Sequence, residues 1–114
     1  MIDLNELASQ AYITAKKREK NGAFIHTEPI AILKHCATEV IEATEAFLNY
    51  KEALNFIDDS VIVDECQQDF ENEIADIIVC CLIISGYSMV NIEKALNRVM
   101  EKNKLRAKKM GDKL

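Results

Sequence analysis

The chain has 114 residues, of which 49% are apolar, and its 14 basic and 19 acidic residues give a formal net charge of −5. This length suffices for one hydrophobic core and leaves no room for a second domain. Three glycines and one proline are too few turn formers for a β-sandwich or a β-barrel. We therefore expect residues 1–114 to form a single all-α domain.

Charge is distributed unevenly along the chain. The segment 102–114 carries six basic residues and one aspartate, a balance of 6 − 1 = +5, so residues 1–101 carry −10. We interpret about residues 107–114 as a basic, solvated helix end, where cations also suit the negative pole of the helix dipole. Nucleic-acid binding is disfavoured for so acidic a body.

From the sequence we expect neither a membrane segment nor a secretory leader. The longest apolar run, 77–84, has eight residues and is too short to cross a bilayer. The first ten residues, MIDLNELASQ, have the pattern of an amphipathic helix. The four cysteines form no CxxC pair, so we expect buried, reduced thiols in a cytoplasmic protein.

Two helices are expected in the first half of the chain. The first spans about residues 3–20, where apolar residues recur at helical spacing, and Asn21-Gly22 supplies a left-handed stop. The second spans about residues 29–56 and begins with Pro29, a residue that is favoured at the first helical position.

Two more helices are expected in the second half. Residues 57–65 contain aspartates and a serine, which favour a loop. The third helix is expected over about 65–85, with Gly86 as its stop. Ser88 or Asn91 caps a fourth helix, which continues to about residue 108 or 109.

The connections between these helices are short, which favours antiparallel packing in a four-helix bundle. The run 77–84 in the third helix, IIVCCLII, is apolar on every side. A helix that is apolar all round is buried all round, and four helices of one short chain cannot easily surround it. We therefore expect a second subunit to cover the remaining face, in a dimer or a dimer of dimers.

Two acidic pairs stand at matching positions of the second and third helices. Glu39 and Glu42 form one pair and Glu73 and Asp76 the other, each with the i, i+3 spacing of one helix face. At about 100° per residue, each pair flanks the apolar stripe of its own helix at the same angle. In the second helix that stripe comprises Cys36, Val40, Phe47 and Leu54.

Packing these stripes together would bring the four carboxylates to one edge of a shared groove. Close, desolvated carboxylates repel one another, so a cation must offset them. Oxygen ligands suit Mg²⁺ above all, or Mn²⁺, and Asp69, one turn before Glu73, is a further candidate ligand. The alternative is that these acidic residues lie on a solvated surface and bind nothing, because the Glu-x-x-Glu pattern also occurs by chance in helices.

The fourth helix carries polar residues on its inner line. Asn103 and Arg106 continue the line begun by apolar residues, and Lys102 lies one turn before Arg106. Such a group suits phosphate oxygens. The alternative is that the helix has already left the core by Asn103.

Together these motifs resemble the MazG-like all-α nucleoside triphosphate pyrophosphohydrolases. The resemblance rests on ATEVIEATEA at 37–46, NEIADIIVCCL at 72–82 and EKNKLR at 101–106. It implies the helical-bundle fold of that superfamily, completed by oligomerisation. The same resemblance implies that Mg²⁺ would be bound by Glu39, Glu42, Glu73 and Asp76. It also implies that phosphates would be held by Asn103 and Arg106, helped by Lys102.

The resemblance also implies a reaction. A nucleoside triphosphate would be hydrolysed to the monophosphate and pyrophosphate by a homodimer or homotetramer, in the removal of non-standard or surplus nucleotides. We assign Glu42 as the base that accepts a proton from water. Val99 stands where many members have a lysine, and the 30-residue spacer 43–72 is long. The alternative is a non-catalytic helical oligomer whose acidic face binds a metal or a basic partner.

Overall fold

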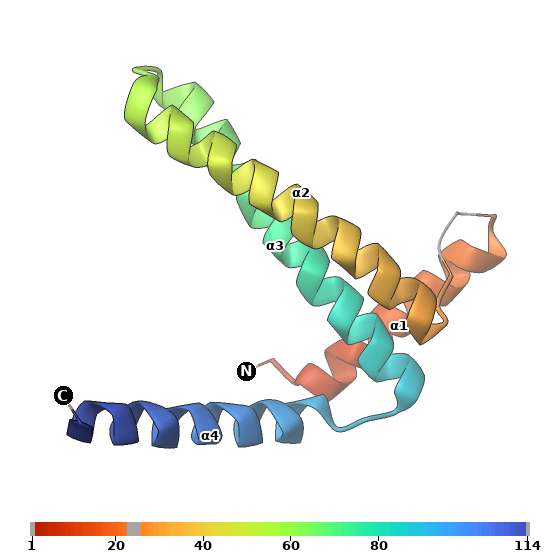
Figure 1. Cartoon of the computed structure of the whole chain (residues 1–114). Coiled ribbons are helices and arrows are strands. Elements are labelled where there is room, and N and C mark those ends of the chain that lie inside the picture. Colours follow the sequence, from red (N-terminus) through yellow and green to blue (C-terminus); the bar gives the residue numbers. More distant parts are fainter. Residues whose placement is uncertain (1, 23–25, 114) are drawn as a thin grey trace.

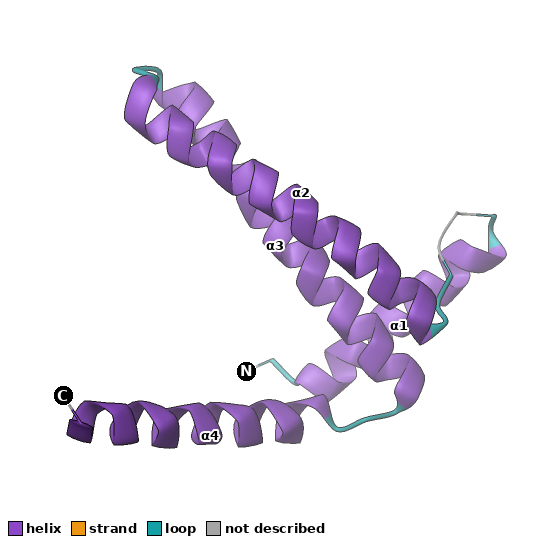
Figure 2. Ribbon diagram, in the orientation of Figure 1, coloured by secondary structure: helices purple, strands orange, loops and turns teal. Residues whose placement is uncertain are grey.

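The computed structural model of the protein describes residues 2–22 and 26–113 (Figure 1). All regular structure in these residues is helical (Figure 2), which confirms the all-α prediction. None of the helices in this part of the chain is long and apolar enough to cross a membrane. The four helices are α1 (Leu4–Lys20), α2 (Pro29–Phe56), α3 (Ser60–Ser88) and α4 (Ile92–Lys113).

The bounds of α1 and α2 agree with the sequence prediction. The Asp3 carboxylate accepts hydrogen bonds from the first backbone N–H groups of α1, which satisfies donors that have no partner within the helix. After α1, Gly22 has a φ of +86°, a backbone conformation that a glycine adopts without steric cost. Pro29 is the first residue of α2, preceded by Glu28 as the N-cap.

Both ends of α3 differ from the prediction. The helix begins at Ser60, because the Asp59 carboxylate accepts a hydrogen bond of 2.9 Å from the backbone N–H of Val61. Most of the expected loop 57–65 is therefore helical. At the other end, Met89 with a φ of +55° terminates the helix, and Gly86 lies inside it.

Gly86 is where α1 crosses α3. A Cβ atom on this residue would collide with the backbone carbonyl oxygen of Ala8 and would lie 2.7 Å from Cβ of Tyr12. The Tyr12 and Tyr87 rings meet edge to face beside it, with centroids 5.7 Å apart. The glycine is therefore required for close packing of the two helices, and the prediction that it ends α3 is wrong.

The helices form a long antiparallel hairpin with one helix across its base. In Figure 1, α2 and α3 run side by side, and α1 crosses α3 at the end away from the connecting loop. α4 packs on the first part of α1 and then leads away. Asn91 caps α4 through the N–H of Lys94 and also accepts a bond from the Asn5 amide, 3.0 Å in each case. The predicted antiparallel packing of all four helices in one bundle, completed by oligomerisation, is not confirmed by the described residues and stays a prediction.

The contact between α2 and α3 is a seam of residues spaced alternately by three and four, the spacing of two packed helices. Every seam residue is buried or half-buried. On α2 the seam comprises Ile32, Cys36, Glu39, Ala43, Ala46, Tyr50 and Ala53; on α3 it comprises Val63, Cys66, Phe70, Glu73, Ile77, Cys80 and Ile84. Two glutamates thus occupy positions that are otherwise almost all apolar.

The stripe expected to form the core of α2 lies mostly outside the seam. Val40, Phe47 and Leu54 are about half exposed, because α2 carries two apolar lines and α3 covers only the line that forms the seam.

The expectation of buried thiols is wrong for Cys81, which is exposed. Cys80 is buried, and this burial raises the pKa of its thiol to about 11. All four cysteines are free thiols.

Candidate metal centre

Three carboxylates meet in the middle of the hairpin. Glu39 and Glu42 from α2 and Glu73 from α3 each place one oxygen within 4.8 Å of the others. The i, i+3 spacing brings the first two together, and the seam brings the third opposite them. The structure therefore unites three of the four carboxylates that the sequence selected as metal ligands.

Glu39 is the most buried of these carboxylates, with only 8% of the residue exposed. Its Oε1 lies 3.0 Å from Nε2 of His35, one turn earlier on α2. Its Oε2 has no hydrogen-bond partner, and neither has Oε2 of Glu73, although both atoms are buried. A buried polar atom without a partner is costly, so the cluster has unused capacity to bind a hydrogen-bond donor or a cation.

The pKa values of Glu39 and Glu73 are both raised, as expected for buried carboxyl groups that lie close together. Burial raises the pKa of the Glu39 carboxyl, and the charge of Glu42 raises it further, while His35 acts in the opposite direction. Burial likewise raises the pKa of Glu73, followed by the charge of Glu42. Both carboxyl groups therefore resist ionisation, first because they are buried and then because neighbouring carboxylates repel their charge.

Asp76 lies at the rim of the cluster. It is exposed and falls outside the close group of three. Its charge nevertheless contributes to the raised pKa of both Glu39 and Glu73. The exposed Asp76 is therefore near enough for its charge to raise the pKa of the two clustered carboxyl groups.

A groove of about 350 Å³ opens beside the cluster, between α2 and α3. We call it the acidic groove, since Glu42, Glu45, Asp69 and Glu73 all line it. Asn49 and Asn72 line it as well, and sequence reasoning did not select them. The spacing could have found Asn49, which stands seven residues after Glu42 and thus on the same side of α2.

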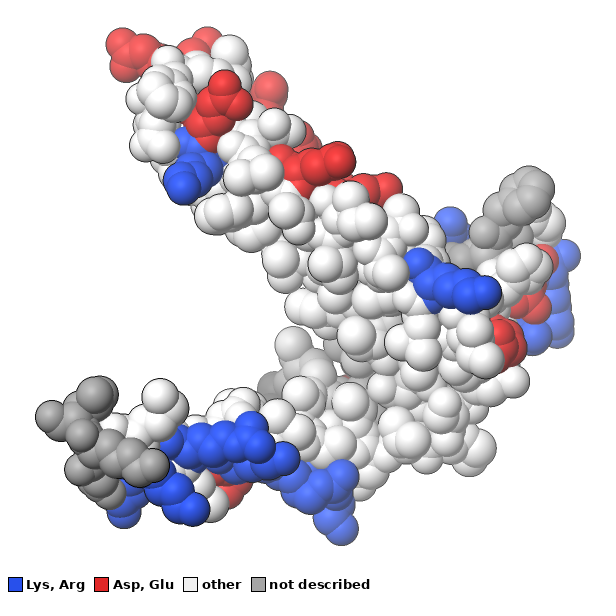
Figure 3. Space-filling model, viewed as in Figure 1, with Lys and Arg blue, Asp and Glu red and all other residues white. Residues whose placement is uncertain are grey.

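The three residues selected as phosphate ligands lie elsewhere. Lys102, Asn103 and Arg106 are all exposed on the second half of α4. Figure 1 shows this half of α4 well away from α2 and α3, and Figure 3 shows basic side chains along it. Within one chain the structure does not bring these residues to the carboxylates.

The donor set of the cluster consists of oxygen atoms alone. Hard divalent cations such as Mg²⁺ prefer such donors, and a cation would neutralise the buried oxygens of Glu39 and Glu73. The residues present therefore fit a divalent ion.

No protein-family model, curated protein or solved structure matches this chain.

Proposed function

We propose that the protein is a Mg²⁺-dependent nucleotide pyrophosphohydrolase. It would convert a nucleoside or deoxynucleoside triphosphate to the monophosphate and pyrophosphate, and would remove surplus or non-standard nucleotides in the cytoplasm. The observation that carries the proposal is Glu39, a buried carboxylate whose Oε2 has no partner, at the centre of three converging carboxylates. The reaction is the one implied by the resemblance of the sequence motifs to those of MazG-like enzymes.

Each carboxylate has a role that matches its position. Glu39, Glu42 and Glu73 would hold the ion, Mg²⁺ or Mn²⁺, with Asp76 at the rim. When bound, the ion would supply positive charge to phosphate oxygens and make a nearby water more acidic. Glu42 is exposed, so its carboxylate can accept a proton from a water molecule that attacks the phosphate chain.

Phosphate contacts are proposed for Lys102, Asn103 and Arg106. Asn103 and Arg106 continue the line of Ile92 and Val99 along α4, so a surface that covers this line would also cover the two polar groups. In a homodimer or homotetramer, that surface can belong to another chain. This is why we propose that the four-helix bundle and the site are completed by oligomerisation.

The test is a pyrophosphate-release assay over all common nucleoside and deoxynucleoside triphosphates, with Mg²⁺ and with EDTA. We expect pyrophosphate and a monophosphate from at least one substrate in Mg²⁺ and none in EDTA. Glu42→Ala and Asp76→Ala should each reduce turnover by about 100-fold or more, since loss even of groups around a metal costs 10–100-fold.

Glu52→Ala and Glu71→Ala are matched controls, because both residues are exposed glutamates on the same two helices. They should retain wild-type turnover. Unchanged turnover in Glu42→Ala and Asp76→Ala would refute the assignment of the site, and a folded wild type that is silent on every substrate would refute the proposed reaction.

The second candidate is a non-catalytic helical oligomer whose acidic face binds a metal or a basic partner. The separation of Arg106 and its neighbours from the carboxylates within one chain favours it. Calorimetry discriminates between the two candidates. Heat from a nucleotide that depends on Mg²⁺ supports the enzyme, whereas Mg²⁺ binding with no effect of any nucleotide supports the binding protein.

A further inference from the structure

Three of the four cysteines gather in the half of the hairpin that α1 crosses. Cys36 on α2 and Cys80 on α3 are both seam residues. Cys80 is 4% exposed and belongs to the buried hydrophobic cluster, and Cys36 packs against that cluster from the other helix. Cys81, the next residue of α3, is exposed. A thiol open to solvent therefore stands beside two thiols of the core.

The geometry of the helices places Cys81 on the same side of the hairpin as Cys36. At about 100° per residue, Cys36 and Phe47 lie on one flank of the α2 seam, and Phe70 and Cys81 lie on one flank of the α3 seam. The Phe47 and Phe70 rings are in contact, with centroids 5.3 Å apart. The two flanks therefore face the same way, and Cys36 lies between the other two cysteines.

The pKa values of Cys80 and Cys81 agree with this placement. Burial raises the pKa of both thiols, and the next cause in both is the nearby Cys36. A raised pKa keeps a thiol protonated at neutral pH and slows its oxidation. The three cysteines are therefore expected to stay reduced until an oxidant is present in excess.

The arrangement fits a disulfide better than a metal site. In the part of the chain that the structure describes, only Glu39, Glu42 and Glu73 bring three ligand atoms within 4.8 Å of one another. The three sulfur atoms therefore do not form a thiolate metal site. Two neighbouring thiols can instead be oxidised to a disulfide.

We propose that Cys36 and Cys81 form an oxidation site, at which hydrogen peroxide converts the two thiols to a disulfide that fastens α2 to α3. The Cys81 thiolate attacks one peroxide oxygen, the O–O bond breaks, and a sulfenic acid and hydroxide form. The hydroxide takes up the proton that the thiol released. The Cys36 sulfur then attacks the sulfenic acid sulfur, the S–S bond forms, and the S–O bond breaks. Its thiol proton leaves with the oxygen as water, so one peroxide oxidises two thiols and yields two waters.

Exposure assigns the first step to Cys81. Cys81 is exposed and Cys80 is buried, so the oxidant meets Cys81 first, and the half-buried Cys36 resolves the sulfenic acid. Hydrogen peroxide is uncharged and scarcely larger than water, so it also reaches Cys81 if another subunit covers the run 77–84. Cys66 takes no part, because it lies 14 residues before Cys80, about 21 Å away along α3, and lines the acidic groove.

The disulfide would act next to the carboxylate cluster. Cys36 precedes Glu39 by three residues, one turn of α2. The bond would therefore hold together the two helices that carry Glu39 and Glu73. Intracellular disulfides of this kind are typical of transient, redox-sensing sites. The proposal goes beyond the proposed activity and stands whether or not the protein hydrolyses nucleotides.

The first test oxidises the full chain with hydrogen peroxide, alkylates the remaining thiols and maps the cysteines by mass spectrometry after cleavage at glutamate and aspartate. We expect one disulfide in each chain, from Cys36 to Cys81, with Cys66 and Cys80 alkylated. Cys81→Ser should abolish the disulfide, whereas the matched control Cys66→Ser should leave it unchanged. A wild type that forms no disulfide, a disulfide that survives in Cys81→Ser, or one that joins two chains would overturn the proposal.

The second test is read on the wild type and decides the case if a variant fails to fold. A disulfide that closes the loop 36–81 restricts the unfolded chain, so oxidation should raise the melting temperature by about 10 °C. Dithiothreitol should reverse the increase. Cys36→Ser, treated in the same way, should show none. Equal melting temperatures for the oxidised and the reduced wild type would overturn the proposal that the bond fastens α2 to α3.

Discussion

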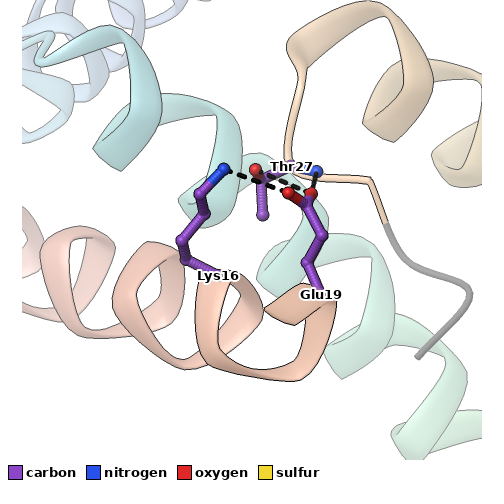
Figure 4. A network of polar contacts seen from close by, with 3 residues as sticks. All are labelled: Lys16, Glu19 and Thr27. Atoms are coloured by element: carbon purple, nitrogen blue, oxygen red, sulfur yellow. Dashed lines mark hydrogen bonds and ion pairs between the residues drawn. The ribbon is translucent and has the colours of Figure 1, made fainter. Parts of the chain in front are cut away.

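Two glutamates of this chain have opposite surroundings. At the junction of α1 and α2, Glu19 accepts three hydrogen bonds: from Lys16 Nζ at 3.0 Å, from the Thr27 backbone N–H at 2.7 Å and from Thr27 Oγ1 at 3.1 Å (Figure 4). These bonds, the backbone one first, lower the pKa of Glu19 to about 2. In the hairpin, Glu39 is buried beside Glu42 and Glu73, and its pKa is raised.

The opposite pKa shifts mean that the ionised Glu19 stabilises the fold, whereas the ionised Glu39 destabilises it. The Glu19 charge is satisfied by Lys16 on α1 and by Thr27 in the segment that leads into α2, so its contribution is structural. Glu39 is only half satisfied, because its Oε1 pairs with His35 while its buried Oε2 has no partner among the described residues. Groups that cost stability in this way are typical of sites that bind a ligand. We use the name α1 junction for the contacts that hold α1 to the rest of the chain, namely the Glu19–Thr27 bonds and the crossing at Gly86. Mutations in the α1 junction should lower the free energy of unfolding, whereas mutations in the carboxylate cluster should raise it.

The largest effect is expected at the α1 junction for Gly86→Ala. In an ordinary helix interior this change stabilises by about 1 kcal/mol. Here the added Cβ would collide with Ala8 and Tyr12 of α1, and we expect a loss of about 3 kcal/mol in urea unfolding. A stabilised variant would show that α1 does not approach α3 so closely.

The opposite sign is expected for Glu39→Leu in the carboxylate cluster. Removing a buried charge without a full set of partners should raise the free energy of unfolding by about 1–2 kcal/mol in EDTA, while activity is lost. Glu52→Leu, at an exposed position of the same helix, should change stability by less than about 0.5 kcal/mol. A clear loss of stability in Glu39→Leu would mean that Glu39 is a structural residue like Glu19.

Thr27→Val tests the junction with a smaller change. Thr27 is 1% exposed, and valine keeps its shape while removing the hydroxyl that bonds to Glu19. We expect a loss of about 1.5 kcal/mol, measured by urea unfolding. An unchanged free energy of unfolding would show that the backbone bond from Thr27 and the Lys16 pair satisfy Glu19 by themselves.

The pH dependence of stability should differ between the two glutamates. The folded pKa of Glu19, about 2, lies below its ordinary value of 4.5, so its contribution is complete above pH 4.5 and is lost as the pH falls towards 2. The pKa of Glu39 is raised, so its cost is absent below pH 4.5 and grows as the pH rises through the raised pKa. Melting curves in EDTA should show Glu39→Gln gaining on the wild type only above pH 4.5. A constant difference from pH 4 to 8 would contradict the raised pKa.

Local signals in the sequence predicted most of the helix bounds. Asn21-Gly22, Pro29 and Asn91 are capping or first-turn residues, and each marks the end or start of a helix as expected. Gly86 was misread because a glycine that ends a helix and a glycine that lets another helix approach look the same in sequence. Only the crossing of α1 distinguishes them.

Periodicity found the carboxylates but placed them inaccurately. It put Glu39 and Glu73 beside the apolar stripes, whereas both lie in the seam itself. α2 carries two apolar lines, and spacing cannot say which of them meets α3 and which meets another chain. For the same reason the sequence could not say how far Lys102, Asn103 and Arg106 lie from the carboxylates, since that distance depends on the direction of α4.

We propose that the carboxylates of Glu39, Glu42 and Glu73 together bind a divalent cation. The most direct measurement is the melting temperature at neutral pH during titration with Mg²⁺, for the wild type, Glu73→Gln and the exposed control Glu71→Gln. At a Mg²⁺ concentration 100 times the dissociation constant, we predict that the free energy of unfolding rises by about 2.7 kcal/mol in the wild type and in Glu71→Gln. Their melting temperatures should rise accordingly, while that of Glu73→Gln should rise much less. A wild-type melting temperature that Mg²⁺ leaves unchanged, or an equal increase in Glu73→Gln, would show that the carboxylate cluster is not a Mg²⁺ site.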